Sequence, residues 1–171
     1  WFGSSQKCQI SYENAVSAWP QMLRFTAIVD GQRQEIRTRL LGTHWVGSIL
    51  ACIAVAHDLG VPLTQIARII EEVAPYPGRM QVVRLPSGAV VIRDEFKGHV
   101  HSTEVAFEEL RKASAERRIL VYGDVDESKS SPRVRLRQIG RQAAELVDFA
   151  IFVGEHSHHG AHGAKLGGLP E

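Results

Sequence analysis

Side chains that can bind anions or exchange protons are concentrated in residues 93–102, which follow a short apolar run ending at Ile92. Asp94 stands at the end of that run, so its carboxylate could accept hydrogen bonds from the hydroxyls of a ribose. Lys97 and His99 could contact anionic oxygens of a ligand. A solvated loop has the same polar composition, with Ser102 as the cap of a following helix. The segment alone fits either interpretation.

A second polar segment, residues 154–162, follows the apolar run that ends at Val153 and contains four histidines within seven residues. Glu155, His156 and His158 could recognise a substrate, or they could belong to a solvated loop. Histidine also binds transition metals. The segment contains no cysteine, however, and its glycines at 160 and 163 favour a loop over a helix, so we predict no metal site.

Two further side chains could contact a ligand. Arg79 follows Gly78 at a break in the pattern, where a guanidinium could hold a phosphate or carboxylate with two hydrogen bonds. His44 begins a helix and could face a ligand near that helix's N-terminus. Each has an ordinary alternative, a surface charge for Arg79 and a buried, hydrogen-bonded imidazole for His44.

The apolar pattern predicts the elements that position these residues. Residues 1–24 show no clear period. A hairpin is expected over residues 25–29 and 35–41 with its turn at Asp30-Gly31, followed by helices from residue 46 to Gly60 and over 63–73. After a break at residues 75–78 we expect a second hairpin (81–85 and 89–92), a helix (102–114), a strand (119–122), a helix (132–146) and a strand (149–153). Strands that alternate with helices predict an α/β fold with parallel strands, whose ligands bind at the carboxyl ends of the strands.

Composition excludes several classes. The formal net charge of +1 makes a nucleic-acid or membrane-surface partner unexpected, and no apolar stretch approaches the length of a membrane span. The two cysteines fit a reducing cytoplasm, and Cys52 has the pattern of a small core residue. No glycine-rich phosphate loop of the G-x-x-x-x-G-K-[ST] type occurs. Without an initiator methionine, the chain is expected to be the interior of a longer protein.

Four segments in this order resemble the Mur ligase family, whose members add amino acids to the muramoyl peptide of the cell wall. Residues 42–51 resemble the family's G-x-H-N-x-x-N-x-x-A helix start, and residues 78–81 resemble its G-R-[MF]-[EQ] segment. Residues 92–102 resemble the I-D-D-x-Y-N-x-N-P-x-S linker loop, and residues 122–127 resemble L-G-D-M-x-E. The last of these, with Ser102 and residues 78–80, is similar to the branch that adds D-alanyl-D-alanine, whereas His99 is nearer to the branch that adds L-alanine.

The resemblance implies an α/β architecture with two parts. Residues 1–76 would be the end of a central ATPase domain without its phosphate loop, and residues 77–171 would be a truncated, Rossmann-like C-terminal ligase domain. Missing N-terminal domains are therefore expected. The full enzyme would use ATP and Mg²⁺ to form an amide bond between a UDP-muramoyl-type carboxylate and an amino acid or peptide through an acyl phosphate, in peptidoglycan precursor synthesis.

The resemblance also implies roles for individual residues. Asp94 and Arg79 match residues that contact ATP, and Trp45 matches an asparagine that contacts the adenine, with His44 beside it. The substrate side would comprise the linker loop and the segment after Val153, with the candidates Lys97, His99, Glu155, His156 and His158. No residue is assigned as catalytic, and the isolated chain is expected to be inactive.

The sequence departs from the family pattern at several of these positions. Trp45 and Ser48 replace asparagines of the helix start, and Lys97 and His99 replace asparagines of the linker loop. An indole can stack on a base but cannot both accept and donate hydrogen bonds as an amide does. Two alternatives follow: a divergent ligase for another acid substrate, or a non-catalytic interaction module.

Overall fold

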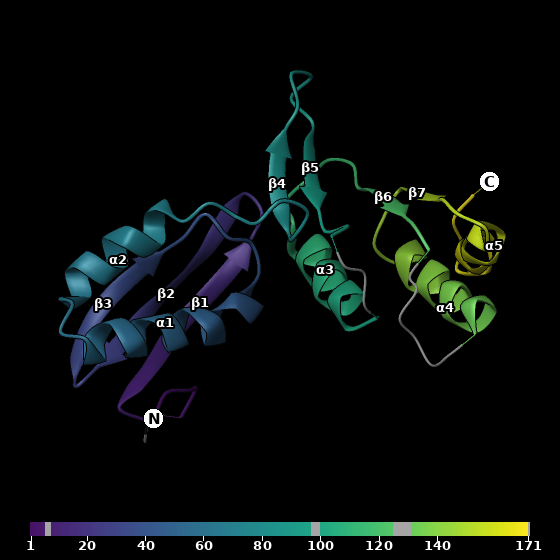
Figure 1. Ribbon diagram of the computed structural model, residues 1–171. Helices are drawn as coiled ribbons and strands as arrows, with labels where there is room; N and C mark the ends of the chain where they lie inside the picture. The colour runs from purple at the N-terminus through teal and green to yellow at the C-terminus, as the bar shows by residue number, and fades with distance from the viewer. Residues whose placement is uncertain (6–7, 97–99, 125–130, 171) are drawn as a thin grey trace. The chain divides into compact units, whose positions relative to one another are not determined.

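The computed structural model describes residues 1–5, 8–96, 100–124 and 131–170, and the chain divides into two compact units, residues 1–96 and 97–171 (Figure 1). The first unit extends past residue 76 and takes in the second predicted hairpin. The guanidinium of Arg84 on that hairpin lies over the Trp19 ring, 4.8 Å from its centroid. This cation–π contact joins the hairpin to the N-terminal sheet.

The first unit is built on an antiparallel sheet of three strands, β1 (Ile10–Ala18), β2 (Gln21–Val29) and β3 (Gln32–Arg37), in the order β1-β2-β3. The hairpin predicted at Asp30-Gly31 is confirmed, because these residues join β2 to β3 with φ angles of 47° and 80°. Positive φ at both central positions matches the twist of a two-residue hairpin.

Residues 1–24, which show no clear period in the sequence, nevertheless form regular structure. That part of the chain contains β1 and the first residues of β2. The register of β1 shifts between Glu13 and Val16 and again between Val16 and Ala18, and Asn14 has a φ of 54°. Bulges of this kind interrupt the period-two alternation by which a strand is recognised in a sequence.

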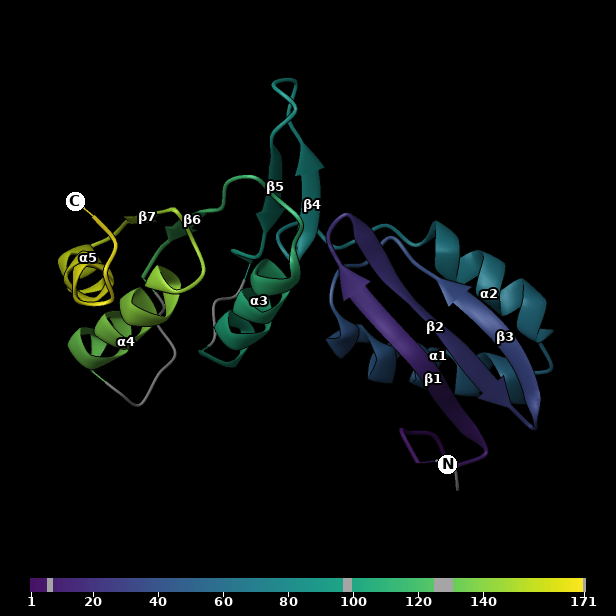
Figure 2. The same ribbon diagram turned by 180° about the vertical axis from the view of Figure 1, so that it is seen from behind.

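Two helices, α1 (Val46–Asp58) and α2 (Leu63–Glu72), cover one face of this sheet (Figures 1 and 2). Both are confirmed, and Gly60 follows the end of α1 with a φ of 82°. The core between helices and sheet consists of large apolar side chains with almost no exposure, among them Leu23, Phe25, Ile36, Leu50 and Ile53.

Cys52, predicted as a small core residue, lies outside this core, and so does Ile69 from the apolar pattern of α2. Cys52 is exposed, and Ile69 keeps 50% of its surface accessible. A helix buries only the stripe that faces the sheet, and the neighbouring positions of an apolar pattern stay in solvent. The apolar positions of α1 and α2 therefore form a wider stripe than the one that is buried against the sheet.

The second hairpin is also confirmed, as β4 (Gln81–Arg84) paired with β5 (Val90–Arg93) in antiparallel register. It forms a two-stranded sheet of its own, whereas the predicted parallel pairing is found in the second unit. There β6 (Ile119–Tyr122) pairs with β7 (Phe149–Phe152) in parallel. The carboxyl ends of β6 and β7 therefore lie at one edge.

Three helices belong to the second unit: α3 (Val100–Lys112), α4 (Pro132–Ala144) and α5 (Ser157–Leu166). The helix predicted over residues 132–146 is confirmed as α4, which starts with proline at its first position after Ser131, whose hydroxyl accepts a hydrogen bond from the Val134 N–H. Phe107 and Ile139 pack with Leu120 and Phe152 from the inner face of the strands.

The loop predicted for residues 154–162 is wrong, because α5 begins within it. The two glycines that favoured a loop instead allow close packing of α5: Gly163 faces α4, and Gly160 leaves room for the Phe152 ring of β7. A Cβ atom on Gly140 would stand 2.2 Å from the Gly160 carbonyl oxygen, and one on Gly163 would stand 2.2 Å from the Arg137 carbonyl oxygen. Packing against α4 thus stabilises a helix of low intrinsic propensity.

The α-helices of the described residues are short, and the longest have 13 residues. Within the described ranges, none combines the length and the apolar run that crossing a bilayer requires.

Candidate functional site

The clearest candidate site lies where the β4–β5 hairpin begins and ends. Asp94 directly follows β5, and its Oδ1 accepts a hydrogen bond of 3.0 Å from the Met80 N–H at the start of β4. Arg79 is the neighbour of Met80, and its guanidinium lies 5.0 Å from the centre of the Phe96 ring. The antiparallel pairing therefore brings a carboxylate and a guanidinium together from positions 15 residues apart in the sequence.

The backbone around Arg79 is in an uncommon conformation. Gly78 and Met80, on either side, have φ angles of 70° and 47°, in the left-handed region that costs a side-chain-bearing residue free energy. Met80 tolerates this because its side chain is buried at 4% exposure and its N–H is bound by Asp94. The role of Met80 in positioning Arg79 could not be predicted from the sequence, since nothing in its residue type signals positive φ.

Gly78 is fixed by its surroundings as well as by its own conformation. Its carbonyl oxygen accepts a 3.0 Å hydrogen bond from the Phe96 N–H, and an added Cβ would stand 3.1 Å from a Glu95 carboxylate oxygen. Tyr76 contacts the Phe96 ring edge to face, with 4.9 Å between ring centres. The predicted break at residues 75–78 is thus an ordered junction that holds Arg79.

Partial burial raises the pKa of the Asp94 carboxyl above its ordinary value. The Met80 N–H and the positive charge of Arg79 act in the opposite direction and favour the carboxylate, but burial has the larger effect. The raised pKa means that the fold places this carboxylate where solvation is incomplete. A hydroxyl donor from a ligand would restore part of that solvation.

His44 and Trp45 lie together in the 3-10 turn Thr43–Trp45 that directly precedes α1, with ring centres 5.0 Å apart. His44 is exposed, and its ring occupies the space above Gly42, where an added Cβ would stand 2.3 Å from a ring carbon. Trp45 is half-buried and packs against the core of the first unit. Its Nε1 is buried without a hydrogen-bond partner among the described residues, so the indole N–H points into the protein.

A second group of candidates lies at the carboxyl ends of β6 and β7. Asp124 follows β6, and its Oδ2 accepts a hydrogen bond of 3.3 Å from the His156 N–H after β7. The same carboxylate lies against Gly154, where an added Cβ would be 2.4 Å from Oδ2. His156 and His158 each contact the His159 ring, and Glu155 is exposed beside them.

Two predicted site residues, Lys97 and His99, lie outside the described residues. In the part of the chain that the structure describes, no three or more metal-binding side chains are grouped so that they could hold an ion. The histidines of residues 156–162 therefore do not form a metal cluster there.

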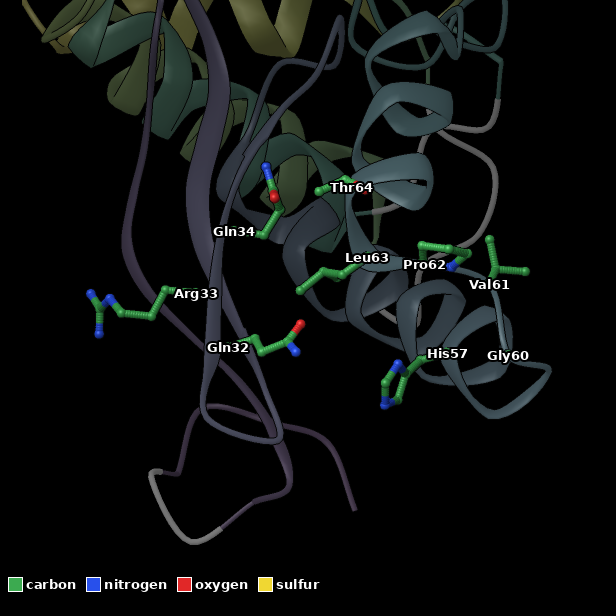
Figure 3. A pocket seen from close by; sticks show the side chains of 9 residues that line it. All are labelled: Gln32, Arg33, Gln34, His57, Gly60, Val61, Pro62, Leu63 and Thr64. Carbon is green, nitrogen blue, oxygen red and sulfur yellow. The ribbon is translucent and has the colours of Figure 1, made fainter.

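A hollow beside the edge strand β3 contains none of the predicted binding residues. It is lined by Gln32 and Gln34 of β3, by residues 60–62 between α1 and α2, and by the first two residues of α2 (Figure 3). His57 at its rim is bonded to Asp30, with Nε2 2.9 Å from Oδ2. We assign no ligand to this hollow.

The parallel strands and packed helices of the second unit define an α/β fold of the Rossmann-like class. Residues 78–167 match the family model described as "Mur ligase, glutamate ligase domain". The chain belongs to the Mur ligase family.

Comparison with individual proteins supports the same assignment. The UDP-N-acetylmuramoyl-tripeptide–D-alanyl-D-alanine ligase of Mycobacterium bovis is 28% identical over 150 residues, which cover 81% of this chain and 29% of that protein. A crystal structure of MurF from Acinetobacter baumannii superimposes with a TM-score of 0.86 at 25% identity, over 96% of this chain and 35% of that one. MurF of Thermotoga maritima, solved in complex with ADP, shares the fold with a TM-score of 0.71 at 13% identity, over 92% and 36%.

The chain spans about a quarter of the length of the first curated relatives that it matches.

Proposed function

We propose that this chain is the part of an ATP-dependent amide ligase that contacts the nucleotide's ribose and phosphates and receives the incoming amine. The whole enzyme would join a UDP-muramoyl-type carboxylate to an amino acid or peptide in the cytoplasm, as a step in peptidoglycan precursor synthesis. The isolated chain would have no ligase activity, because it contains no phosphate-binding loop.

The observation that supports this proposal best is the Arg79–Asp94 junction. A half-buried carboxylate pinned by a backbone N–H retains an Oδ2 that can accept a hydrogen bond from a ribose hydroxyl. The Arg79 backbone lies between two residues of positive φ, and its guanidinium lies over the Phe96 ring. A guanidinium positioned in this way can bind a phosphate oxygen with little loss of side-chain entropy. The bound ADP of the structurally similar Thermotoga maritima MurF agrees with a nucleotide at this type of fold.

When bound, ATP would supply the phosphoryl group that activates the substrate carboxylate. The residues of this chain would orient it: Asp94 by accepting from the ribose, Arg79 by neutralising phosphate charge, and His44 at the start of α1 near the base. The described residues offer no cluster that would hold Mg²⁺, so its ligands would come from the nucleotide and from other parts of the enzyme.

The amine would bind on the second unit, where His156, His158 and Glu155 stand at the carboxyl end of β7, with Lys97 and His99 of the linker loop. The Mycobacterium bovis relative, named for the D-alanyl-D-alanine dipeptide, supports that dipeptide as the first amine to test. L-alanine is the second, because of His99.

Calorimetric titration of MgATP into the full-length ligase tests the nucleotide contacts. Asp94→Asn should weaken binding about tenfold, the loss typical of one charge-assisted hydrogen bond, while the control Asp58→Asn at the exposed end of α1 should not change it. Equal affinities of Asp94→Asn and the unsubstituted enzyme would contradict the proposal. Phosphate release by the isolated chain would contradict its expected inactivity.

The environment of Trp45 favours a second candidate, a Mur-like ligase for another acid or an interaction module that has lost its nucleotide. An indole whose N–H points into the protein cannot donate a hydrogen bond to the edge of a base. Trp45→Asn in the full-length protein distinguishes the two candidates. A tighter MgATP complex supports the ligase, and the absence of any MgATP binding in both forms supports the module.

A further inference from the structure

Strand β3 forms one edge of the three-stranded sheet, so only one of its sides is bonded to β2. The hairpin turn determines which backbone groups are used. Because Val29 and Gln32 close a two-residue turn, they exchange hydrogen bonds, and so does every second pair after them. The same alternation is found just beyond β3, where the Thr38 N–H donates to the Leu23 carbonyl oxygen over 3.1 Å. The even-numbered residues of β3 are therefore the ones bonded to β2.

The odd-numbered residues, Arg33, Glu35 and Arg37, point their backbone groups away from the sheet. The carbonyl oxygen of Glu35 accepts a hydrogen bond of 3.1 Å from the Gln34 side-chain amide, as a group facing outward can. Within the described residues, no backbone group outside the sheet bonds to these three residues. Such an edge is a template on which a further strand can pair.

The two edges of this sheet differ in how open they are to pairing. The register of β1 shifts between Glu13 and Val16 and again between Val16 and Ala18, and bulges of this kind protect an edge from a further strand. Strand β3 pairs with β2 without a shift from Gln32 to Arg37. The regular edge that can accept a strand is therefore that of β3.

The space beside β3 is open along the strand. The hollow shown in Figure 3 lies next to its first half. A smaller hollow continues between its second half and α2, and the charged side chains that line it are Glu35, Arg37, Arg68 and Glu71. Two cations and two carboxylates give this lining a formal charge of zero. A strand that approaches this edge therefore meets no net repulsion.

The side chains of β3 alternate in charge on the face that is turned away from the helices. Figure 3 shows Arg33 on the opposite side of β3 from Gln32. Arg33 is paired with Glu13 of β1 at 2.6 Å, and Arg37 is paired with Glu35 at 2.8 Å. The side chains of Arg33, Glu35 and Arg37 are 55%, 48% and 63% exposed, so a neighbouring strand could still contact them.

This order of charges matches a second copy of the same strand. If two β3 strands run antiparallel about a two-fold axis at Gln34, Arg33 of each copy lies opposite Glu35 of the other. The outward backbone groups of those residues then face each other and form four hydrogen bonds. An axis at Glu35 would instead place Arg33 against Arg37 and Glu35 against itself. An axis at Ile36 would engage only residues 35–37 of β3.

We propose that this chain forms a two-fold dimer through the β3 edge, with its axis at Gln34, so that two sheets join into one of six strands in the order β1-β2-β3-β3-β2-β1. A second copy is the partner because it matches both the outward backbone groups and the order of charges. So short an edge buries less surface than the roughly 1,200 Å² of a stable complex, and the dissociation constant should be about 0.1 mM. The dimer rests on the first unit and does not depend on the proposed ligase function.

Sedimentation equilibrium of the 171-residue chain, from about 0.01 to 1 mM, tests the dimer. The average mass should rise from that of the monomer toward twice that value, and a chain that stays monomeric throughout overturns the proposal. Glu35→Pro removes one outward N–H and no bond to β2, as an edge strand tolerates, and should stay monomeric. Its circular dichroism must match that of the unsubstituted chain. A folded Glu35→Pro that still dimerises overturns the β3 interface.

Exchanged charges test the same interface without proline. Arg33→Glu and Glu35→Arg each place like charges opposite one another in a dimer of identical copies, so each should associate about tenfold more weakly. An equimolar mixture of the two variants restores opposite charges in both pairs and should associate like the unsubstituted chain. A mixture that associates no better than either variant overturns the proposal. Arg111→Glu and Glu116→Arg make the same changes at exposed positions of the second unit and should have no effect.

Disulfide cross-linking tests the position of the axis. Cys8 and Cys52 are free, so both are first replaced by serine. In that background Gln34→Cys places two thiols in a non-hydrogen-bonded pair on the axis, with Cα atoms about 4.5 Å apart, and oxidised glutathione should convert the chain into a dimer that a reductant separates. Gln32→Cys, two residues from the axis on the same face, should cross-link far less. Equal cross-linking at both positions overturns the axis at Gln34.

Discussion

The two units bury their helices by different means. In the first, α1 and α2 stand off the sheet by the thickness of large side chains, and Leu23, Phe25, Ile36, Leu50 and Ile53 fill the space. In the second, α4 and α5 touch almost backbone to backbone through Gly140, Gly160 and Gly163. The stability of the first unit should therefore depend on side-chain volume, and that of the second on the absence of side chains.

The same contrast appears on the strands. The sheet of the first unit turns its apolar side toward two helices, while β6 and β7 expose Ile119, Val121, Phe149 and Ile151 on their outer face. Parallel strands are normally covered on both faces. Because one face of these strands is uncovered, we expect the α4–α5 contact to contribute a larger part of the stability of the second unit.

Leu50→Ala should produce the largest effect. Leu50 is 1% exposed in the core of the first unit, and removing such a side chain costs about 2–5 kcal/mol. The three tryptophans, Trp1, Trp19 and Trp45, all belong to the first unit, so urea unfolding followed by tryptophan fluorescence reports on this unit alone. A decrease of less than about 1 kcal/mol in the free energy of unfolding, which is on the scale of a surface substitution, would contradict the packing described for this core.

Gly140→Ala should come next, with a loss of about 1–3 kcal/mol in the second unit, because its methyl group would overlap the Gly160 carbonyl and must push α5 away. Far-UV circular dichroism of the helices should show the loss, while the tryptophan fluorescence midpoint stays where it is. If the fluorescence midpoint moved as far as the dichroism, the two units would not unfold independently and the contrast would fail.

Gly47→Ala, on α1, sharpens the comparison by having the opposite sign. Nothing lies within 4 Å of the added methyl group, and α1 gains helix propensity, so the first unit should become more stable by up to about 1 kcal/mol. Fluorescence-detected unfolding measures this directly. If Gly47→Ala were destabilised, the effect of replacing glycine by alanine would not distinguish the two units.

Asp94→Asn should have the smallest effect on stability, and it should be favourable at neutral pH. Burial raises the pKa of Asp94 in the folded state, so the native protein holds this proton more tightly and loses stability as the pH rises through that pKa. Asparagine keeps the acceptor for Met80 and removes the buried charge, which should add less than about 1 kcal/mol at pH 7.

The gain from Asp94→Asn should vanish below the ordinary pKa of 3.8, where the carboxyl is protonated in both states. Unfolding experiments between pH 3 and pH 7 check this sign, since a gain that grew toward low pH would contradict it. If Asp94→Asn is both more stable and weaker in nucleotide binding, then the natural aspartate lowers the stability of the protein and increases its affinity for the nucleotide.

Much of the architecture could be predicted because local patterns agreed with the final packing. Asp30-Gly31, Ser131-Pro132 and the apolar spacing of α1 and α2 each indicate their element without help from distant residues. The resemblance of four segments to Mur ligases likewise placed Asp94 and Arg79 among the residues to examine. Prediction failed at β1, whose bulges erase its period, and at α5, whose glycines have opposite meanings in a loop and in a helix contact.

The sequence by itself determined the order and type of most elements, the membership of an ATP-using ligase family and the residues that could bind a ligand, because these depend on residue type and spacing. The tertiary structure decided which of those residues meet. Asp94 binds the Met80 N–H across the hairpin, the Trp45 ring packs against the core with its N–H buried, and Gly163 lets α5 approach α4, whose arginines are near His159. Each is a contact between residues far apart in the chain, which no local pattern encodes.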